Sequence, residues 1–497
     1  MMKNKILIFL MMGSLLVTSC SEDQLEITND NQPDFLQVYA SGDDVYNVVS
    51  GLYNTFYSAQ ASISGIGPML ATAADNASCS WGNFAMRDMS WEPRKAWTNT
   101  PGYPYQNNTK YHFDKMYASI NTASLALKAM NNGLDIGKEG VNNNLVKAFA
   151  RFNMGIAYGS LALNFDQAFI VDEEISIENA TTGDSSSYTE IAAQALKYLD
   201  EAISLSNNSF TIPSSWMGSQ GDITNVELKA YANSWAARII SGLPRNTTEN
   251  SSVDWSKVLT YANNGITSDM NVILDGYNQW YNSLTDYLTY PGWGVIDMYV
   301  INKLDPTMPD HWTDSPTFPA PPESTNSNAD KRITTDYEYV PSNWLRSDRG
   351  YYHWSNYRYS RYDDIYALGV GPAPQFLLAE NDLYIAEALA HNGDLAGAAA
   401  KINAGTRVTR GNLPEVAANL NDIMEAIHHE RVVELPFSST GLQFYEMRKN
   451  NLLQKGTPLH LPLPARTLET FGDPQPFYTF GGPDGADGVN GSNGGWR

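Results

Sequence analysis

The side chains of this 497-residue chain that are best suited to recognise a ligand are aromatic. Its 12 Trp, 29 Tyr and 17 Phe make up 12% of the residues. Many of them fall in two stretches, 76–110 and 276–366, among Gly, Asn and Pro. Flat Trp and Tyr rings match the apolar C–H face of a sugar, and Asn, Asp and Arg match its hydroxyl groups. The two stretches therefore predict a surface that binds a saccharide.

We expect aromatic and polar residues of both stretches to contact the ligand. The candidate ligand-binding residues are Asn76, Trp81, Asn83, Arg87, Trp91, Trp97, Trp280, Trp293 and Trp312. The two stretches are expected to meet on one face and to form a shared platform. Alternatively, these aromatics pin long loops onto the rest of the chain. We expect about half of them to do only that, because large aromatic side chains are mostly buried.

The sequence carries no recognisable signature of catalysis. It contains no His-Glu-x-x-His, nucleophile elbow, phosphate-binding glycine loop or Cys-x-x-Cys. In His428-His429-Glu430, neighbouring helical residues point about 100° apart, so the two imidazoles cannot face one metal ion. Asp363-Asp364 could serve a glycosidase, but an acidic chain contains many such pairs. We therefore predict no catalytic residue and no metal site.

The last residues contain a pattern that could suit a cation. Asp484, Asp487, Asn490 and Asn493 repeat an oxygen ligand every third residue between glycines, and calcium takes oxygen ligands. The full spacing of an EF-hand loop is missing, so we favour a flexible, solvated tail and expect no cofactor.

Charge and cysteine content exclude further classes of protein. The chain has 54 Asp plus Glu against 32 Lys plus Arg, a formal charge of −22, which repels the phosphate backbone of nucleic acids. Two cysteines are too few for a disulfide framework or a structural zinc site. Cys79 is expected to be a small buried residue.

Apolar residues recur at helical spacing through most of the chain. Stripes of this kind cover 45–56, 113–127, 145–163, 191–203, 228–239, 378–389 and 423–433. Ser187 with Glu190, and Thr224 with Glu227, match the capping box that begins a helix. These patterns predict an all-α protein.

Small residues mark positions where helices are expected to pack closely. Gly155 and Gly159 would each cost about 1 kcal/mol relative to Ala within a helix, and close helix packing would compensate. Ala386, Ala398 and Gly405 match the small-residue spacing of a tetratricopeptide repeat, whose period is about 34 residues. Other helical pairs are expected at 111–165, 188–240 and 227–266. We predict an irregular tetratricopeptide-like array with long loop-rich insertions that form a binding face.

The start of the chain indicates export. Lysines precede an apolar run at 6–17, which is too short to span a membrane and is typical of a signal peptide. Val17-Thr18-Ser19-Cys20 resembles a bacterial lipobox, so we expect Cys20 to carry fatty-acyl chains such as palmitate. Glu22 and Asp23 resemble the surface-export signal of Bacteroidetes lipoproteins. The expected organisation is a signal peptide (1–19), a lipidated tether (20–40), a single domain (41–480) and a Gly-rich tail (481–497).

Motifs of the C-terminal half, taken in order, resemble those of one family. They are LLAENDLYIAEAL at 377–389, the segment 394–407, IHHERVVEL at 427–435, LQFYEMRK at 442–449 and PLPAR at 462–466. The chain resembles the SusD/RagB family of outer-membrane lipoproteins from Bacteroidetes, over nearly its whole length. It departs from the family's pattern at Ser438-Ser439, where Glu-Gly is usual, and in its Gly-rich tail.

The resemblance implies an α-helical body with four tetratricopeptide-like units, whose long loops bind a nutrient, most often a glycan. It implies a lipid-anchored protein of the outer membrane that faces the cell exterior and catalyses no reaction. Its implied partner is a SusC-like, TonB-dependent transporter that imports the ligand. The alternatives are a relative that binds peptide or another nutrient, a helical glycoside hydrolase, and a scaffold whose repeats bind another protein.

Overall fold

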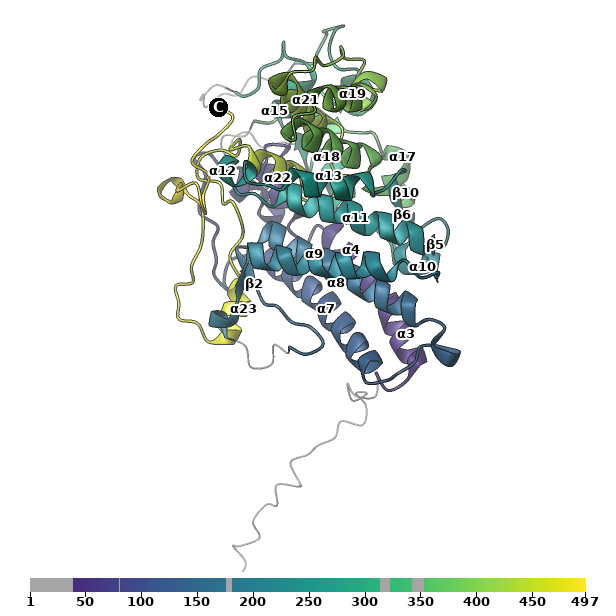
Figure 1. Ribbon diagram of the computed structural model, residues 1–497. Helices are drawn as coiled ribbons and strands as arrows, with labels where there is room; N and C mark the ends of the chain where they lie inside the picture. Colours follow the sequence, from purple (N-terminus) through teal and green to yellow (C-terminus); the bar gives the residue numbers. More distant parts are fainter. Residues whose placement is uncertain (1–38, 80, 176–180, 313–321, 342–352) are drawn as a thin grey trace, which may run out of the picture.

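The structure is a computed structural model, and it describes residues 39–79, 81–175, 181–312, 322–341 and 353–497. The apolar stripes form helices that pack side by side in a stack of layers, which Figure 1 shows from one side. The helices of this stack are α7 (Gln106–Asn131), α8 (Asn143–Asn164), α9 (Tyr188–Leu205), α11 (Asn225–Gly242), α13 (Trp255–Asn263), α18 (Leu378–His391), α19 (Leu395–Asn403) and α21 (Leu420–Val433). The predicted all-α, tetratricopeptide-like architecture is confirmed.

Local signals in the sequence explain where these helices begin and how closely they pack. Both predicted capping boxes form, at the starts of α9 and α11. A Cβ atom on Gly155 would lie 2.6 Å from Leu199 Cγ, and one on Gly159 would lie 2.3 Å from Ile239 Cδ1. Only glycine therefore lets α8 approach α9 and α11 this closely, as the sequence predicts.

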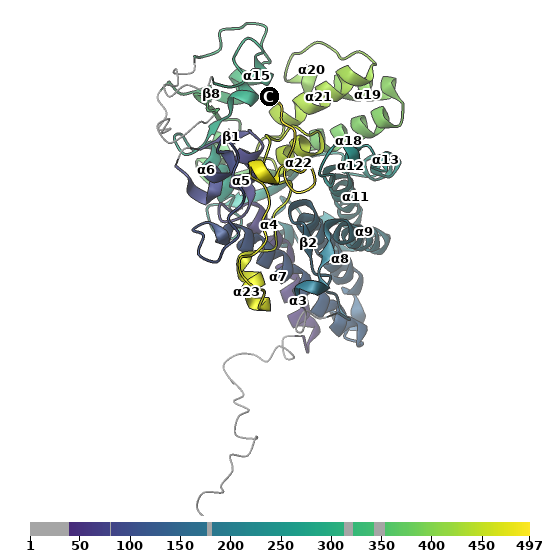
Figure 2. The same cartoon turned by 90° about the vertical axis from the view of Figure 1, so that its left-hand side faces the viewer.

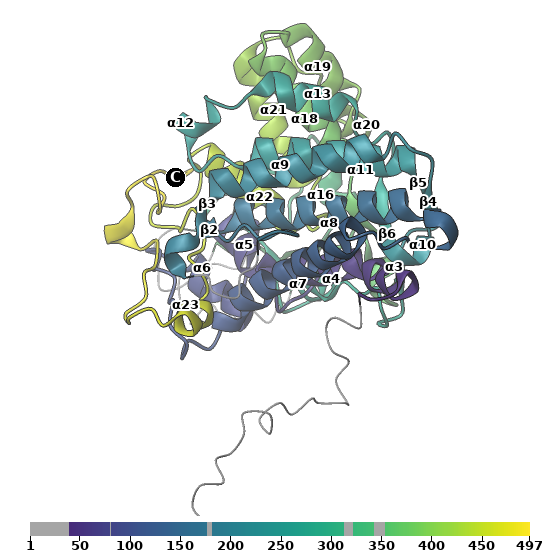
Figure 3. The ribbon, with the colours of Figure 1, turned by 60° about the horizontal axis from the view of Figure 1, so that its bottom comes forward.

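The N-terminal helices extend the stack at one end and lead to the loop-rich side. Figure 3 shows α3 and α4 beside α7. Figure 2 shows α5, α6, β1 and β8 on the side opposite to α9, α11, α13 and α18. The bounds of the N-terminal helices are α3 (Gly42–Ser50), α4 (Leu52–Gln60), α5 (Gly67–Ala73) and α6 (Met86–Ser90).

Short helices and strands interrupt the loops of the stretch 276–366. Its helices are α14 (Ser283–Thr289), α15 (Met298–Leu304), α16 (Arg332–Thr335) and α17 (Asp363–Tyr366). Asn282 and Asp297 cap α14 and α15 with their side chains, and the aromatic residues around them bury enough surface to order the chain. The stretch is therefore loop-rich, as expected, and short helices and strands lie between its loops.

The strands that the structure describes are short and form antiparallel pairs. The pairs are β1 (Ala77–Ser78) with β7 (Val295–Ile296), β2 (Gln167–Ala168) with β3 (Ser186–Ser187), β4 (Thr211–Ile212) with β5 (Ile223–Thr224), β6 (Met270–Asp275) with β10 (Val370–Phe376), and β8 (Tyr337–Tyr339) with β9 (Tyr357–Tyr359). Within the described residues, the pairs form separate two-stranded sheets and no extended sheet.

The Gly-rich tail packs on the body of the protein, so the expectation of a flexible tail is wrong. Trp496 Nε1 donates a hydrogen bond to Asp75 Oδ2 at 2.7 Å, and its ring centroid lies 4.7 Å from that of Tyr299. Asp487 Oδ1 accepts backbone hydrogen bonds from Asn490 at 2.7 Å and Gly491 at 2.9 Å. Trp496 packs its partly buried ring on the body of the protein, and Asp487 closes a turn within the tail.

Two further sequence expectations concern burial and membranes. Cys79 is fully buried, as predicted, and this burial raises the pKa of its thiol. Across the part of the chain that the structure describes, no helix combines the length and the apolar character needed to cross a membrane.

Candidate functional site

A strand pair joins the two aromatic stretches. In β1 and β7, Ala77 lies opposite Ile296 and Ser78 opposite Val295. Trp81 follows β1 and Trp293 precedes β7, so in an antiparallel pair both leave from the same end. The two stretches, distant in sequence, therefore meet at this end of the pair.

Four rings from the two stretches form what we term the aromatic cluster: Trp81, Phe84, Tyr287 and Trp293. The ring centroids of Trp81 and Trp293 lie 6.3 Å apart, and those of Tyr287 and Trp293 lie 5.6 Å apart with the planes 23° from parallel. Phe84 meets Tyr287 edge-on at 5.2 Å. All four side chains are half-buried, so the cluster has an interior face and a face toward solvent.

Polar groups surround the cluster. Asn83 Nδ2 donates a hydrogen bond to the Tyr287 hydroxyl at 2.9 Å. Burial raises the pKa of Tyr287 to about 12, so its phenol is neutral at physiological pH and retains a proton to donate. The Arg87 side chain is 34% exposed and lies 3.5 Å from Asp88. The site therefore presents flat rings beside amide, hydroxyl and guanidinium donors.

The backbone beneath the cluster is strained. Phe84 has φ of 53° and Ala85 has φ of 61°, in the left-handed region that costs non-glycine residues about 1 kcal/mol or more. A strained backbone of this kind persists only where the surrounding structure holds it in place. At Phe84 the strained conformation directs the ring toward Tyr287.

Burial removes three of the predicted tryptophans from the binding surface. Trp97 is 2% exposed and packs edge-on against Tyr103 at 5.2 Å. Trp280 is 5% exposed, with its ring 5.4 Å from that of Tyr57. Trp312 is 8% exposed and donates its Nε1 hydrogen to the backbone oxygen of Trp354 at 2.7 Å. A sugar cannot stack on these rings, so their assignment as ligand contacts is corrected.

Two other candidates are not among the four rings of the cluster, although Arg87 lies 5.7 Å from the ring centroid of Trp91. Asn76 is 2% exposed, next to β1, so it too is corrected to an interior residue. Trp91 is half-buried, and the ammonium group of Lys95 lies 4.0 Å from its ring centroid. One face of Trp91 is therefore occupied by a cation–π contact.

The reasoning from sequence missed Phe84 and Tyr287. Tyr287 lies on α14, within a stretch that was expected to be mostly irregular. Leu284 and Leu288, four residues apart and both buried, were the signal for this helix.

Solved structures resemble this chain closely in fold. A SusD superfamily protein from Bacteroides vulgatus matches with a TM-score of 0.57 and 16% identity, over 82% of this chain and 88% of that chain. A SusD superfamily protein from Bacteroides fragilis matches with a TM-score of 0.56 and 16% identity, over 90% of this chain and 95% of that chain. The chain has a SusD-like fold. A protein from Bacteroides vulgatus described as a SusD-like carbohydrate binding protein matches with a TM-score of 0.55 and 19% identity, over 83% of this chain and 84% of that chain.

Comparison with protein-family models gave no match, and comparison with curated proteins gave none either. The likeness therefore rests on structure.

The SusD-like motifs supply the buried charges of the helical body. Glu387 of α18 accepts hydrogen bonds from Arg431 and Lys449, each at 2.6 Å. Arg431 also reaches Glu446 at 2.8 Å, on α22 (Leu442–Lys449). Each of these groups is at least nine-tenths buried. The motifs thus fasten α18, α21 and α22 together through ion pairs that the reasoning from sequence did not foresee.

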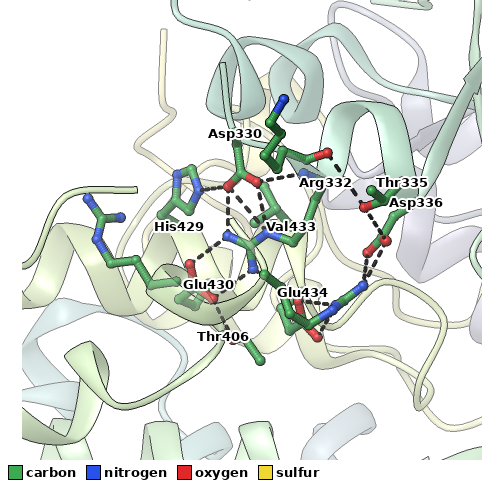
Figure 4. Close-up of polar contacts among 12 residues, drawn as sticks. Asp330, Arg332, Thr335, Asp336, Thr406, His429, Glu430, Val433 and Glu434 are labelled. Atoms are coloured by element: carbon green, nitrogen blue, oxygen red, sulfur yellow. Dashed lines mark hydrogen bonds and ion pairs between the residues drawn. The ribbon is translucent and has the colours of Figure 1, made fainter. Parts of the chain in front are cut away.

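A second set of buried ion pairs ties the loop-rich side to α21. In Figure 4, Arg332 of α16 lies between Asp330 and Glu430, with nitrogen–oxygen distances of 2.7 Å to each. Its guanidinium also reaches Glu434 at 3.0 Å. Arg410 bridges Glu434 and Asp336 in turn. Charge pairing therefore anchors the stretch 276–366 on the helical stack.

The adjacent histidines point to different partners, as predicted. His428 Nδ1 lies 3.0 Å from Glu446, and His429 Nε2 lies 3.0 Å from Asp330. Within the described ranges, no three His, Cys, Asp or Glu side chains are grouped so that they could hold a metal ion.

A hollow of about 340 Å³ lies between α18, α19 and α21, away from the cluster. Its charged side chains pair with one another: Arg361 with Glu434 at 2.8 Å, and Lys401 with Asp382 at 2.6 Å. No aromatic ring is among the described residues that line this hollow, so we place the candidate binding site at the aromatic cluster.

Proposed function

We propose that the protein binds a glycan at the aromatic cluster and releases it unchanged. The observation that carries this proposal is the half-exposed group of rings from Trp81, Phe84, Tyr287 and Trp293, with Asn83 and Arg87 around it. A saccharide needs flat apolar faces for its C–H groups and donors and acceptors for its hydroxyls. The carbohydrate-binding description of one protein with this fold supports the proposal.

Each side chain has a distinct part in this proposal. The exposed ring surfaces of Trp81 and Trp293 stack on sugar faces. Tyr287, held by Asn83, donates its hydroxyl proton to a sugar oxygen. Arg87 donates from its exposed guanidinium. No step of bond breaking is part of this proposal.

We propose further that the protein is anchored in the outer membrane through acyl chains on Cys20 and faces the cell exterior. There it would pass glycan to a SusC-like, TonB-dependent transporter. The lipobox-like segment, the acidic residues behind it and the SusD-like fold support this assignment. Cys20 lies outside the described residues.

Binding and turnover are tested together with a panel of polysaccharides. The neutral members are laminarin, xylan, mannan, dextran and amylopectin, and the acidic members are polygalacturonate and alginate. We expect at least one to retard the soluble protein in affinity gel electrophoresis without new reducing ends. New reducing ends that disappear on changing a single Asp or Glu would establish a glycoside hydrolase instead. Retention by no member would contradict glycan binding.

A further inference from the structure

A second hollow opens beside the hairpin of β8 and β9. Its volume is about 600 Å³, within the range of roughly 300 to 1,000 Å³ that small-molecule sites occupy. We call it the β8–β9 groove. Side chains from α16, the two strands and α17 line it, among them Thr334, Glu338, Tyr339, Tyr357, Arg358 and Asp363.

One hydrogen bond links the groove to the helix that carries Tyr287 of the aromatic cluster. Arg358 Nη1 donates a hydrogen bond to the backbone oxygen of Thr289 at 3.3 Å, at the end of the helix that carries Tyr287. Tyr290 follows, is 54% exposed, and accepts a backbone hydrogen bond from Trp293 at 3.3 Å. An exposed aromatic residue thus lies on the segment that joins the groove to the cluster.

The charges of the groove select among sugars. Arg358 lies 2.5 Å from both Glu338 and Asp363, whose side chains are 53% and 43% exposed. Glu323 also lines the groove, so three carboxylates face one guanidinium. The excess negative charge repels uronate or sulfated units. Each carboxylate can accept more hydrogen bonds than Arg358 supplies, and sugar hydroxyls are suitable donors.

The walls add aromatic surface to these acceptors. The ring centroids of Tyr339 and Tyr357 lie 5.3 Å apart in an edge-on arrangement, and Tyr339 is only half-buried. The groove therefore presents ring surface next to carboxylate acceptors, whereas the aromatic cluster presents rings beside amide, hydroxyl and guanidinium donors.

We propose that the β8–β9 groove is a second saccharide subsite, which takes neutral sugar units of the same chain that the aromatic cluster holds. This inference rests on the proposed function. Two subsites on one glycan act as linked binding events, so their affinities reinforce each other. The protein therefore binds a neutral polysaccharide more tightly than either subsite would alone.

Filling the groove tests the inference. Thr334→Trp places a bulky ring at an exposed residue that lines the groove. The matched control is Thr470→Trp, at an exposed threonine of α23 (Ala465–Phe471) whose hydroxyl, like that of Thr334, donates to a nearby backbone oxygen. Affinities for the neutral polysaccharides of the panel are measured by isothermal titration, and Tm is measured on the same samples. We expect Thr334→Trp to weaken binding by roughly tenfold or more, while Thr470→Trp matches the wild type.

A second pair of variants distinguishes a loss of binding in the groove from a folding defect. Glu338→Gln keeps the side-chain shape and removes one charged acceptor, and Asp364→Asn is its control outside the groove lining. We expect Glu338→Gln to weaken neutral-polysaccharide binding several-fold at unchanged Tm, since a charged acceptor binds hydroxyls more strongly than a neutral one.

The outcomes separate this inference from the function on which it rests. If Trp293→Ala loses affinity while Thr334→Trp and Glu338→Gln bind as their controls do, the second subsite is overturned and glycan binding stands. If Thr334→Trp weakens only alginate or polygalacturonate, the groove takes acidic sugars and the inference is overturned. If the wild type retains no polysaccharide, the proposed function fails and the subsite fails with it.

Discussion

Trp293 and Trp280 have different roles because their surroundings differ. Trp293 stacks on Tyr287 with part of its surface toward solvent. Trp280 is 5% exposed and lies against Tyr53 and Tyr57. Loss of the first ring removes surface that a ligand can use, whereas loss of the second leaves a cavity in the core.

Alanine variants of these two residues should therefore separate binding from stability. Stacking on one ring is worth about 1 to 3 kcal/mol, by analogy with base stacking, so Trp293→Ala should weaken glycan binding by roughly tenfold or more with Tm nearly unchanged. Trp280→Ala should lower the free energy of unfolding by about 3 to 5 kcal/mol. Affinity and melting are measured on the same samples. If the two variants lost the same stability, Trp293 would have only a structural role.

Asp297 is a buried carboxyl with an expected effect on pH dependence. Burial, followed by the nearby Asp75 charge, raises the pKa of Asp297 to about 7, while an unfolded Asp titrates near 3.9. The folded protein thus holds the proton more tightly, so this group contributes stability at low pH that is lost as pH rises from about 4 to about 7.

Asp297→Asn should remove that dependence. The amide oxygen can still accept a hydrogen bond, from Ser78 or from the Tyr299 backbone, as the carboxylate does. Tm of the variant should fall less than that of the wild type between pH of about 5 and about 7. The exposed Asp364→Asn is the control, and parallel curves for all three proteins would contradict the assignment.

At the scale of elements, the stack depends on close approach and on buried charge. Gly155 and Gly159 bring α8 against its neighbours, and Arg332 joins α16 to α21 through carboxylates that are at most 2% exposed. Both devices hold the loop-rich side in a fixed place relative to the helices, and that side carries the aromatic cluster.

Gly155→Ala should destabilise the protein although alanine favours a helix. Propensity contributes about 1 kcal/mol in favour of Ala. The new methyl group would meet Leu199 at 2.6 Å from Cγ and 3.1 Å from the backbone nitrogen, and overpacking of this kind costs about 1 to 3 kcal/mol. Urea unfolding measures the net change in the free energy of unfolding. Gly102→Ala, with nothing within 4 Å of the new atom, is the control, and a Gly155→Ala variant as stable as the wild type would show that the helices can separate.

Arg332→Ala should be among the most damaging single changes in the molecule. It leaves Asp330, Glu430 and Glu434 buried without their shared cation, and breaking a buried pair costs about 3 to 5 kcal/mol. Arg466→Ala removes a pair with Glu469 whose side chains are 47% and 46% exposed, and should cost less than about 1 kcal/mol. Denaturant unfolding of both variants compares them directly. Similar losses would mean that the buried network contributes little.

At the scale of the whole molecule, the chain combines a helical stack on one side with a loop-rich side opposite (Figure 2). The proposed acyl anchor would tether this body at its N-terminal end, ahead of α3. Under this proposal, capture of glycan at a cell surface requires both the anchor and the loops. Separate variants test each of the two.

Cys20→Ser should leave an unprocessed or soluble form, because the acylated side chain is lost. Membrane fractionation and acyl labelling measure this. Replacing Glu22 and Asp23 with alanine should keep the lipid but leave the protein inside the cell envelope, which protease treatment of intact cells detects. A Cys20→Ser protein that still fractionates with the outer membrane would contradict the anchor.

Much of the fold could be predicted from the spacing of residues that lie close together in the sequence. The helices, both capping boxes and the close approach at Gly155 and Gly159 depend on residues a few positions apart, so their signals survive in a single sequence. The motifs at 377–389, 427–435 and 442–449 likewise indicated the SusD-like fold that the solved structures show.

Only the tertiary structure decided which aromatic residues face solvent. Trp81 and Trp293 meet because β1 pairs with β7, while Trp97 and Trp312 become interior residues through contacts with distant segments. The docking of Trp496 on Asp75 reversed the expectation for the tail in the same way. Exposure depends on contacts between residues tens to hundreds of positions apart, and neither composition nor periodicity encodes such contacts.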